Sequence, residues 1–227
     1  MQQVRQGGRP SREASERLGE QILDAATELF LTNGFGATSV EAVAQRVGIA
    51  KRTFYHRYPD KSALFAAVVQ RIIARLRPAA SVPLIEGADL AAILERLAAL
   101  ILRAALSPQA IALRRLIVAE SARFPELAGM LAREGSTAEA VALIAGILDR
   151  DVKAGRIALD DTDFAAREFL HMVIALPQGR AMGLGNPLGR RELEQWPRKV
   201  VDLFLHGCRV APATATAPRR SRAAIAR

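Results

Sequence analysis

Hydrophobic residues recur at three- and four-residue spacing along most of the chain, which is the pattern of amphipathic α-helices with one buried face. The first such helix is expected to begin at Ser15, and Asn33-Gly34 supply residues that tolerate the left-handed helix end. Its apolar face consists of Leu18, Ile22, Ala25, Ala26, Leu29 and Phe30. Strand-like alternation is nearly absent, so the pattern predicts an all-α fold.

Three more helices are expected before Pro78. Thr38 and Glu41 have the spacing of a capping box, which predicts that Thr38 opens a short helix ending at Gly48. A second short helix covers residues 50–58. A longer one follows Asp60 and is expected to act as a lever between the two parts of the chain.

Changes in composition divide the chain into four parts. Residues 1–14 indicate a flexible basic arm, and residues 15–77 a small helical domain with a connecting helix. Prolines and a glycine mark a boundary, after which residues 78–208 form a larger helical domain. Residues 209–227, rich in alanine and arginine, are expected to be a disordered basic tail. In the larger domain helices are predicted at about 90–106, 108–123, 125–133, 136–154, 163–180 and 191–207.

Residues 40–58 have the composition of a helix-turn-helix. Val40, Val43 and Val47 give the first helix an apolar face, and Gly48 permits the sharp turn between the two helices. The second helix then exposes long, basic or hydroxyl-bearing side chains. Those side chains suit contacts with base edges and phosphates.

Charge is concentrated at the two ends of the chain. The total is 32 basic and 23 acidic side chains, or +9, but residues 1–77 carry +5, residues 78–208 carry −1 and residues 209–227 carry +5. Basic ends on a neutral body favour a polyanionic partner, either nucleic acid or an anionic membrane surface. A merely solubilising surface is the other interpretation.

The run from Thr38 to Lys61, followed by Ala63-Leu64, resembles the DNA-binding signature of TetR-type transcriptional regulators. Residues 120–127 and 201–207 are similar to the AcrR/AefR-like branch of that family. The resemblance implies an N-terminal three-helix helix-turn-helix DNA-binding domain and a C-terminal helical domain for ligand binding and dimerisation. It also implies double-stranded DNA as a partner.

The resemblance implies roles for individual residues. Thr38 and Ser39 would hold a phosphate at a helix start, and Lys51 and Arg52 would face the major groove. Backbone phosphates would be gripped by Thr53, Tyr55, His56 and Lys61. Phe54 and Tyr58 would be core residues. Two positions depart from the family pattern: Ala50 replaces the usual serine, and Arg52 replaces a small residue.

The last two predicted helices carry apolar stripes wider than one core requires. Pairing them with their twins would form a four-helix bundle, which predicts a homodimer. The alternative is that both helices are buried within one subunit. The expected interface residues are Phe169, Met172, Val173, Leu176, Trp196, Val200 and Phe204.

A small hydrophobic ligand is the other expected partner. Helices rich in alanine and leucine between residues 90 and 148 could enclose a pocket. Candidate polar lining residues are Arg114, Glu120, Arg167 and His171. For each of them a surface ion pair or a satisfied core position is the alternative interpretation.

Other function classes find little support in the sequence. One cysteine, Cys208, excludes an internal disulfide, and three unpaired histidines give no basis for a metal site; no cofactor is expected. Catalytic residues are not predicted, because no Ser-His-Asp ordering, Walker loop or GxGxxG motif is present. With no apolar run of about 18 residues and no secretory signal, a cytoplasmic protein without a membrane span is expected.

These observations predict a ligand-responsive repressor that binds a palindromic operator as a dimer. Two alternatives stay open: a DNA-binding protein that responds to no ligand, and a helical protein that associates with membrane surfaces.

Overall fold

The computed structural model describes residues 12–76, 89–127, 129 and 137–208, and every regular element in these ranges is a helix. The N-terminal part contains α1 (Arg12–Asn33), α2 (Val40–Val47), α3 (Lys51–Tyr55) and α4 (Lys61–Leu76). Residues 12–14, predicted as part of a flexible arm, instead form the first turn of α1. The rest of that arm, the boundary at 78–88 and the tail at 209–227 lie outside the described residues.

The C-terminal part contains α5 (Leu90–Ala105), α6 (Pro108–Glu120), α8 (Thr137–Lys153), α9 (Thr162–Ala181) and α10 (Arg190–Cys208). Polar N-caps start three of them, because Asp89, Ser107 and Asp161 accept hydrogen bonds from backbone amides that the helix leaves free. Pro108 occupies the first turn of α6, as predicted. The prediction of an all-α fold is confirmed.

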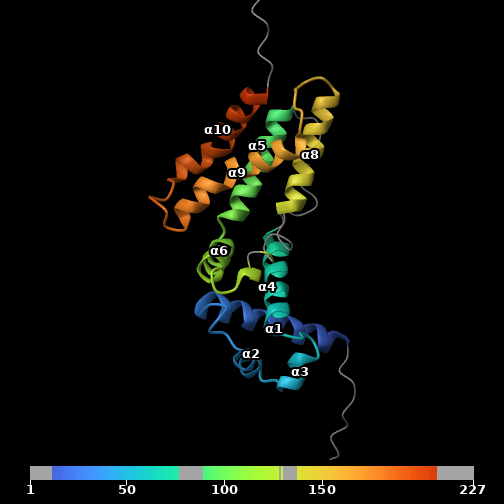
Figure 1. The fold of residues 1–227 in the computed structure, drawn as a ribbon, viewed down its shortest axis with the longest axis vertical. Helices are drawn as coiled ribbons and strands as arrows, with labels where there is room; N and C mark the ends of the chain where they lie inside the picture. Colours follow the sequence, from blue (N-terminus) through green and yellow to red (C-terminus); the bar gives the residue numbers. More distant parts are fainter. Residues whose placement is uncertain (1–11, 77–88, 128, 130–136, 209–227) are drawn as a thin grey trace, which may run out of the picture.

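The molecule is elongated, with α1–α3 at one end and α5, α8, α9 and α10 at the other (Figure 1). Helix α4 rises from the first end, and α6 lies between the two groups. None of the helices in the described ranges is long and apolar enough to cross a membrane.

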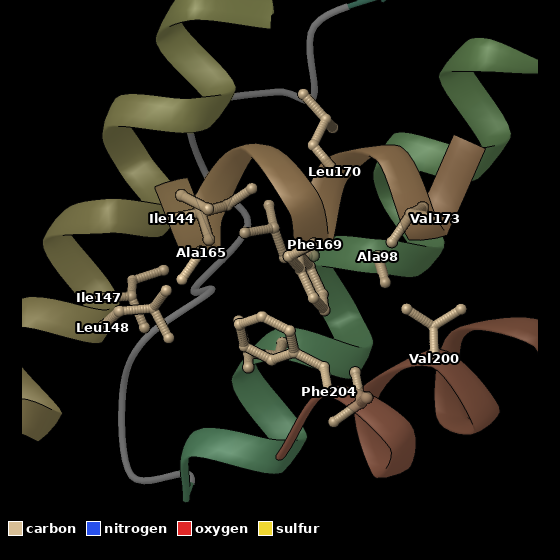
Figure 2. Packing of buried hydrophobic residues seen from close by; sticks show 14 of the residues in the cluster. Ala98, Ile144, Ile147, Leu148, Ala165, Phe169, Leu170, Val173, Val200 and Phe204 are labelled. Atoms are coloured by element: carbon tan, nitrogen blue, oxygen red, sulfur yellow. The ribbon is translucent and has the colours of Figure 1, made fainter. Parts of the chain in front are cut away.

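The C-terminal core lies between α5, α8, α9 and α10. Figure 2 shows Phe169 of α9 facing Phe204 of α10, with Ile144 and Leu148 of α8 nearby. The two rings meet edge to face with centroids 5.0 Å apart, a favoured aromatic geometry. This packing determines which faces of α9 and α10 stay exposed.

Most of the predicted dimer stripe is therefore core. Phe169, Val173, Val200 and Phe204 are buried within a single chain and belong to the C-terminal core, so their part in a dimer interface stays a prediction. Met172 and Trp196 are partly buried against the same cluster, and the Trp196 indole N–H donates to the Val173 carbonyl at 2.9 Å. Of the predicted stripe only Leu176 is largely exposed. The burial of the main stripe agrees with the alternative stated from the sequence, and the dimer itself stays a prediction.

The N-terminal core is built around three phenylalanines, Phe30, Phe35 and Phe65, whose ring centroids are 5.2–5.7 Å apart. Helix α6 joins this core from beyond the predicted boundary. Its side chains in the cluster are Leu113, Leu116 and Ile117, and Leu127 follows from the next turn. Helix α6 thus connects the two ends of the molecule by packing, in addition to the covalent link through α4.

Candidate nucleic-acid interface

Helices α2 and α3 form the predicted helix-turn-helix. Gly48 ends α2 with φ of 76°, the left-handed region that glycine adopts without strain. Phe54 is fully buried and anchors α3 to the N-terminal core, as predicted from the resemblance. Tyr58 lies half-buried against the same core. This anchoring leaves the other side of α3 facing solvent.

The start of α2 differs from the capping-box prediction by one residue. Ser39 is the N-cap, and its hydroxyl accepts from the Ala42 amide at 3.0 Å. Thr38 is only 2% exposed, and its hydroxyl donates to the carbonyls of Leu29 (3.1 Å) and Gly34 (2.8 Å). Its side chain fastens α2 to the end of α1 and is therefore not available to a phosphate.

The exposed face of α3 and its C-cap carries most of the predicted contact residues. These are Lys51, Arg52, Thr53, Tyr55 and His56. Ala50 is the N-cap of α3 and makes no side-chain cap hydrogen bond, which is the structural consequence of its departure from the usual serine. The sequence prediction and the structure agree on which side of this helix faces outward.

The two predicted base-reading residues differ in whether they form an ion pair. Lys51 Nζ lies 2.5 Å from Glu41 Oε1, an ion pair that joins α3 to α2. The hydrogen bond from Lys51 lowers the pKa of Glu41, and the same hydrogen bond raises the pKa of Lys51. Arg52 is exposed and has no carboxylate within 4.0 Å in the described part of the chain. Glu41 was not predicted to belong to this site.

Arg57, the next basic residue, is a structural contact. Its Nη2 donates to the carbonyl oxygen of Ser15 at 2.6 Å and to the Ser15 hydroxyl at 2.7 Å. Its guanidinium also packs over Gly19, where a Cβ would lie 2.4 Å from Nη1. The end of α3 is therefore joined to α1, a contact over 42 residues that no sequence pattern indicated.

Lys61 also takes a structural position. Its ammonium donates to the carbonyls of Phe35 (2.8 Å) and Gly36 (3.3 Å) and lies 4.4 Å from the centre of the Phe35 ring. Burial lowers the pKa of Lys61. In this geometry its side chain closes the turn between α1 and α2, which differs from the predicted grip on a phosphate.

The four candidate ligand residues do not surround one cavity. Arg167 pairs with Asp163, and His171 Nδ1 lies 3.6 Å from Glu168, both on the exposed surface of α9. Arg114 is exposed on α6. Glu120 accepts a hydrogen bond from the Gly36 amide at 3.2 Å, so it contacts the helix-turn-helix end instead. Arg167 therefore forms a surface ion pair, and His171 lies beside Glu168 on the same exposed face of α9.

Two protein-family models match the chain. One, described as "Bacterial regulatory proteins, tetR family", matches residues 22–68. The other, described as "AefR-like transcriptional repressor, C-terminal domain", matches residues 92–207, which is more than half of the chain. Together they cover the helix-turn-helix and the helices from α5 to α10.

Known proteins show the same similarity. The HTH-type transcriptional regulator UidR of Escherichia coli K12 is 31% identical over 121 residues, 52% of this chain and 58% of UidR. The chain thus matches less than two thirds of the length of that curated relative.

Solved structures match over more of the chain. The Flavonoid-responsive Regulator FrrA has a TM-score of 0.72 and 32% identity, with coverage of 86% of this chain and 98% of FrrA. A TetR-family regulator from Mesorhizobium loti MAFF303099 has a TM-score of 0.72 and 28% identity, with coverage of 88% and 100%. Because one family model alone spans half of the sequence and FrrA is matched along almost its full length, this chain belongs to the TetR family, with a C-terminal domain of the AefR-like type.

Proposed function

We propose that this protein is a DNA-binding transcriptional regulator that represses transcription from a palindromic operator. The single observation that carries the proposal is the exposed basic face of α3. Arg52 and His56 face solvent there, and the buried Phe54 ring fixes the orientation of the helix. A short exposed helix with free donors suits the major groove, where arginine pairs with guanine O6 and N7.

A second copy of the chain would double the number of base pairs read. The exposed apolar residues of α9 and α10 support a dimer, since Phe164 is 60% exposed and Leu203 67% exposed. Both line an apolar groove of about 510 Å³ that also includes Met172. The proposed interface therefore uses the outer faces of the two helices, and the buried Phe169 and Val200 support it from beneath.

Selection of sites from random DNA duplexes by the purified full chain tests the function. We expect enrichment of a palindrome, and we expect Arg52→Ala to cost about 1–3 kcal/mol on the selected site and to relax the preference at one position of each half-site. Arg114→Ala, which removes the same charge from exposed α6, is the matched control. No enrichment of any duplex would refute the proposal, and binding to anionic vesicles alone would support the membrane-surface alternative.

A response to a small molecule is the second part of the proposal. FrrA, matched over 98% of its chain, carries flavonoid responsiveness in its name, which supports a small-molecule effector for this chain as well. Such a ligand would lower DNA affinity only by its differential affinity for two states of the dimer. A shift in duplex affinity on adding a flavonoid tests this part.

A further inference from the structure

A cleft of about 580 Å³ opens where the start of α5, the end of α8 and the end of α10 meet. These three helix ends lie together at the top of Figure 1, at the opposite end of the molecule from α2 and α3. Its apolar wall is aliphatic and consists of Leu90, Ile93, Ile147, Ile157 and Leu205. The volume is within the range of small-molecule pockets.

Of the described residues that line the cleft four are charged, and three of these already have partners. The Asp89 carboxylate caps α5 and accepts from the Ala92 amide at 2.8 Å. Asp151 is buried, and Arg156 Nε donates to its Oδ1 at 2.5 Å. These contacts satisfy the helix start and neutralise one positive and one negative charge.

Arg150 is the exception. Its Nε donates to the Gly146 carbonyl at 3.3 Å, one turn earlier on α8. No carboxylate of a described residue lies within 4.0 Å of its guanidinium. The cleft therefore combines an aliphatic wall with the Arg150 guanidinium and the N-cap carboxylate of Asp89, neither of which has an ion-pair partner among the described residues.

We propose that this cleft is the effector site and that it binds a small organic acid. The apolar body of the ligand would cover the aliphatic wall, and its carboxylate would pair with Arg150. Guanidinium groups bind carboxylates through two parallel hydrogen bonds, which gives orientation as well as affinity. An effector role for this cleft rests on the proposed function, whereas binding of the acid does not depend on DNA.

The position of the cleft suggests how binding would reach the DNA-binding end. Helix α5 runs without interruption from the cleft to Ala105, and α6 begins three residues later at Pro108. Helix α6 packs Leu116 and Ile117 into the core that contains Phe65. A displacement of the start of α5 therefore has a continuous packed route to the helices that hold α3.

Calorimetry with the full chain and a matched ligand pair tests the site. The probes are 1-naphthoate and its uncharged analogue 1-naphthamide, which have the same aromatic body. We expect the parent protein to bind the acid about tenfold more tightly than the amide, because only the acid can form a charge-assisted hydrogen-bonded pair with Arg150. Arg150→Gln should abolish that preference, and Ala91→Trp, which fills the cleft, should abolish binding of both probes.

Lys153→Gln is the matched control, because it removes one exposed positive charge from the same end of α8 without lining the cleft. Its affinity for both probes should equal that of the parent. Circular dichroism would establish that each variant is folded, and Arg150→Glu provides a second charge change at the same exposed position. Equal affinity of the parent for acid and amide, or unchanged binding in folded Ala91→Trp, would overturn the proposal.

A DNA-binding measurement distinguishes failure of this inference from failure of the proposed function. Naphthoate should weaken binding of the selected duplex by the parent and leave Arg150→Gln unaffected. If the chain selects no duplex, the regulator proposal fails, while calorimetry still shows whether the cleft binds the acid. If it selects a duplex but shows no acid preference, only the cleft proposal fails.

Discussion

Lys51 of α3 and Glu41 of α2 form an ion pair, with Nζ and Oε1 2.5 Å apart, on the surface that we propose meets DNA. Both side chains are about half exposed, so the pair is accessible to solvent and to a polyanion. A phosphate or a guanine acceptor would compete with Glu41 for the ammonium. The affinity of this surface for DNA is therefore expected to include the cost of opening the pair.

Replacing Glu41 with glutamine tests that competition. The change removes a negative charge close to the proposed interface and releases Lys51, so duplex affinity should rise several-fold. The dependence of binding on salt should also become steeper, because one more cation can displace counterions. Fluorescence anisotropy across a salt series measures both. Glu194→Gln on α10, which breaks the comparable pair with Arg190, is the control, and lower affinity in Glu41→Gln would mean that the pair positions Lys51 for binding.

The same pair makes a prediction about pH. Lys51 lowers the pKa of Glu41 below its ordinary 4.5, so the contribution of the pair to stability is fully present above pH 4.5 and is lost as pH falls through the lower folded value. In Lys51→Met the Glu41 pKa should return towards its ordinary value. Carboxyl NMR titration of the two proteins measures this difference, and identical titration curves would contradict the pairing in solution.

Lys61 distinguishes a structural role from a phosphate contact. Lys61→Met removes the donor to the Phe35 and Gly36 carbonyls, so the free energy of unfolding should fall by about 1–3 kcal/mol. The salt dependence of DNA binding should remain unchanged. Urea denaturation and anisotropy provide the two readouts, with exposed Lys199→Met on α10 as the control. Unchanged stability with a flatter salt dependence would favour the role that the family resemblance implied.

We expect Phe169 to stabilise the folded subunit. It is fully buried against Phe204 in the C-terminal core, so Phe169→Ala should cost about 3–5 kcal/mol through lost burial and the cavity left behind. Thermal and urea unfolding of the parent and the variant measure the change. A variant as stable as the parent would contradict the burial of this ring.

Leu203 should show the opposite behaviour. Its side chain is 67% exposed on α10, so Leu203→Glu should leave the subunit folded and place a charge in the proposed dimer interface. Sedimentation should then report a monomer, while the parent sediments as a dimer. Leu184→Glu is the matched control, since Leu184 is also exposed but lies outside the apolar groove. If Leu203→Glu still sediments as a dimer, the interface lies on another surface of the subunit.

Features that depend on neighbouring residues were predictable from the sequence. The α2–Gly48–α3 unit follows from apolar spacing and from the glycine at position 48, since glycine is the residue type that adopts positive φ without strain. The buried Phe54 and the exposed Lys51, Arg52 and His56 follow from the period of the helix. The first turn of α2 was predicted within one residue, because Thr38 and Ser39 are both good caps and only the packing against α1 selects between them.

Contacts between distant segments were not predictable in this way. Helical periodicity shows that Phe169 and Phe164 both belong to apolar parts of α9, but only the positions of α5, α8 and α10 bury one and expose the other. The same limit applies to Arg57 on Ser15 and to the aliphatic cleft around Arg150, whose walls come from α5, α8, α10 and the loop that follows α8. Local sequence determined where helices begin, end and carry charge, whereas tertiary packing decided which of those faces meet each other, because burial depends on residues far away along the chain.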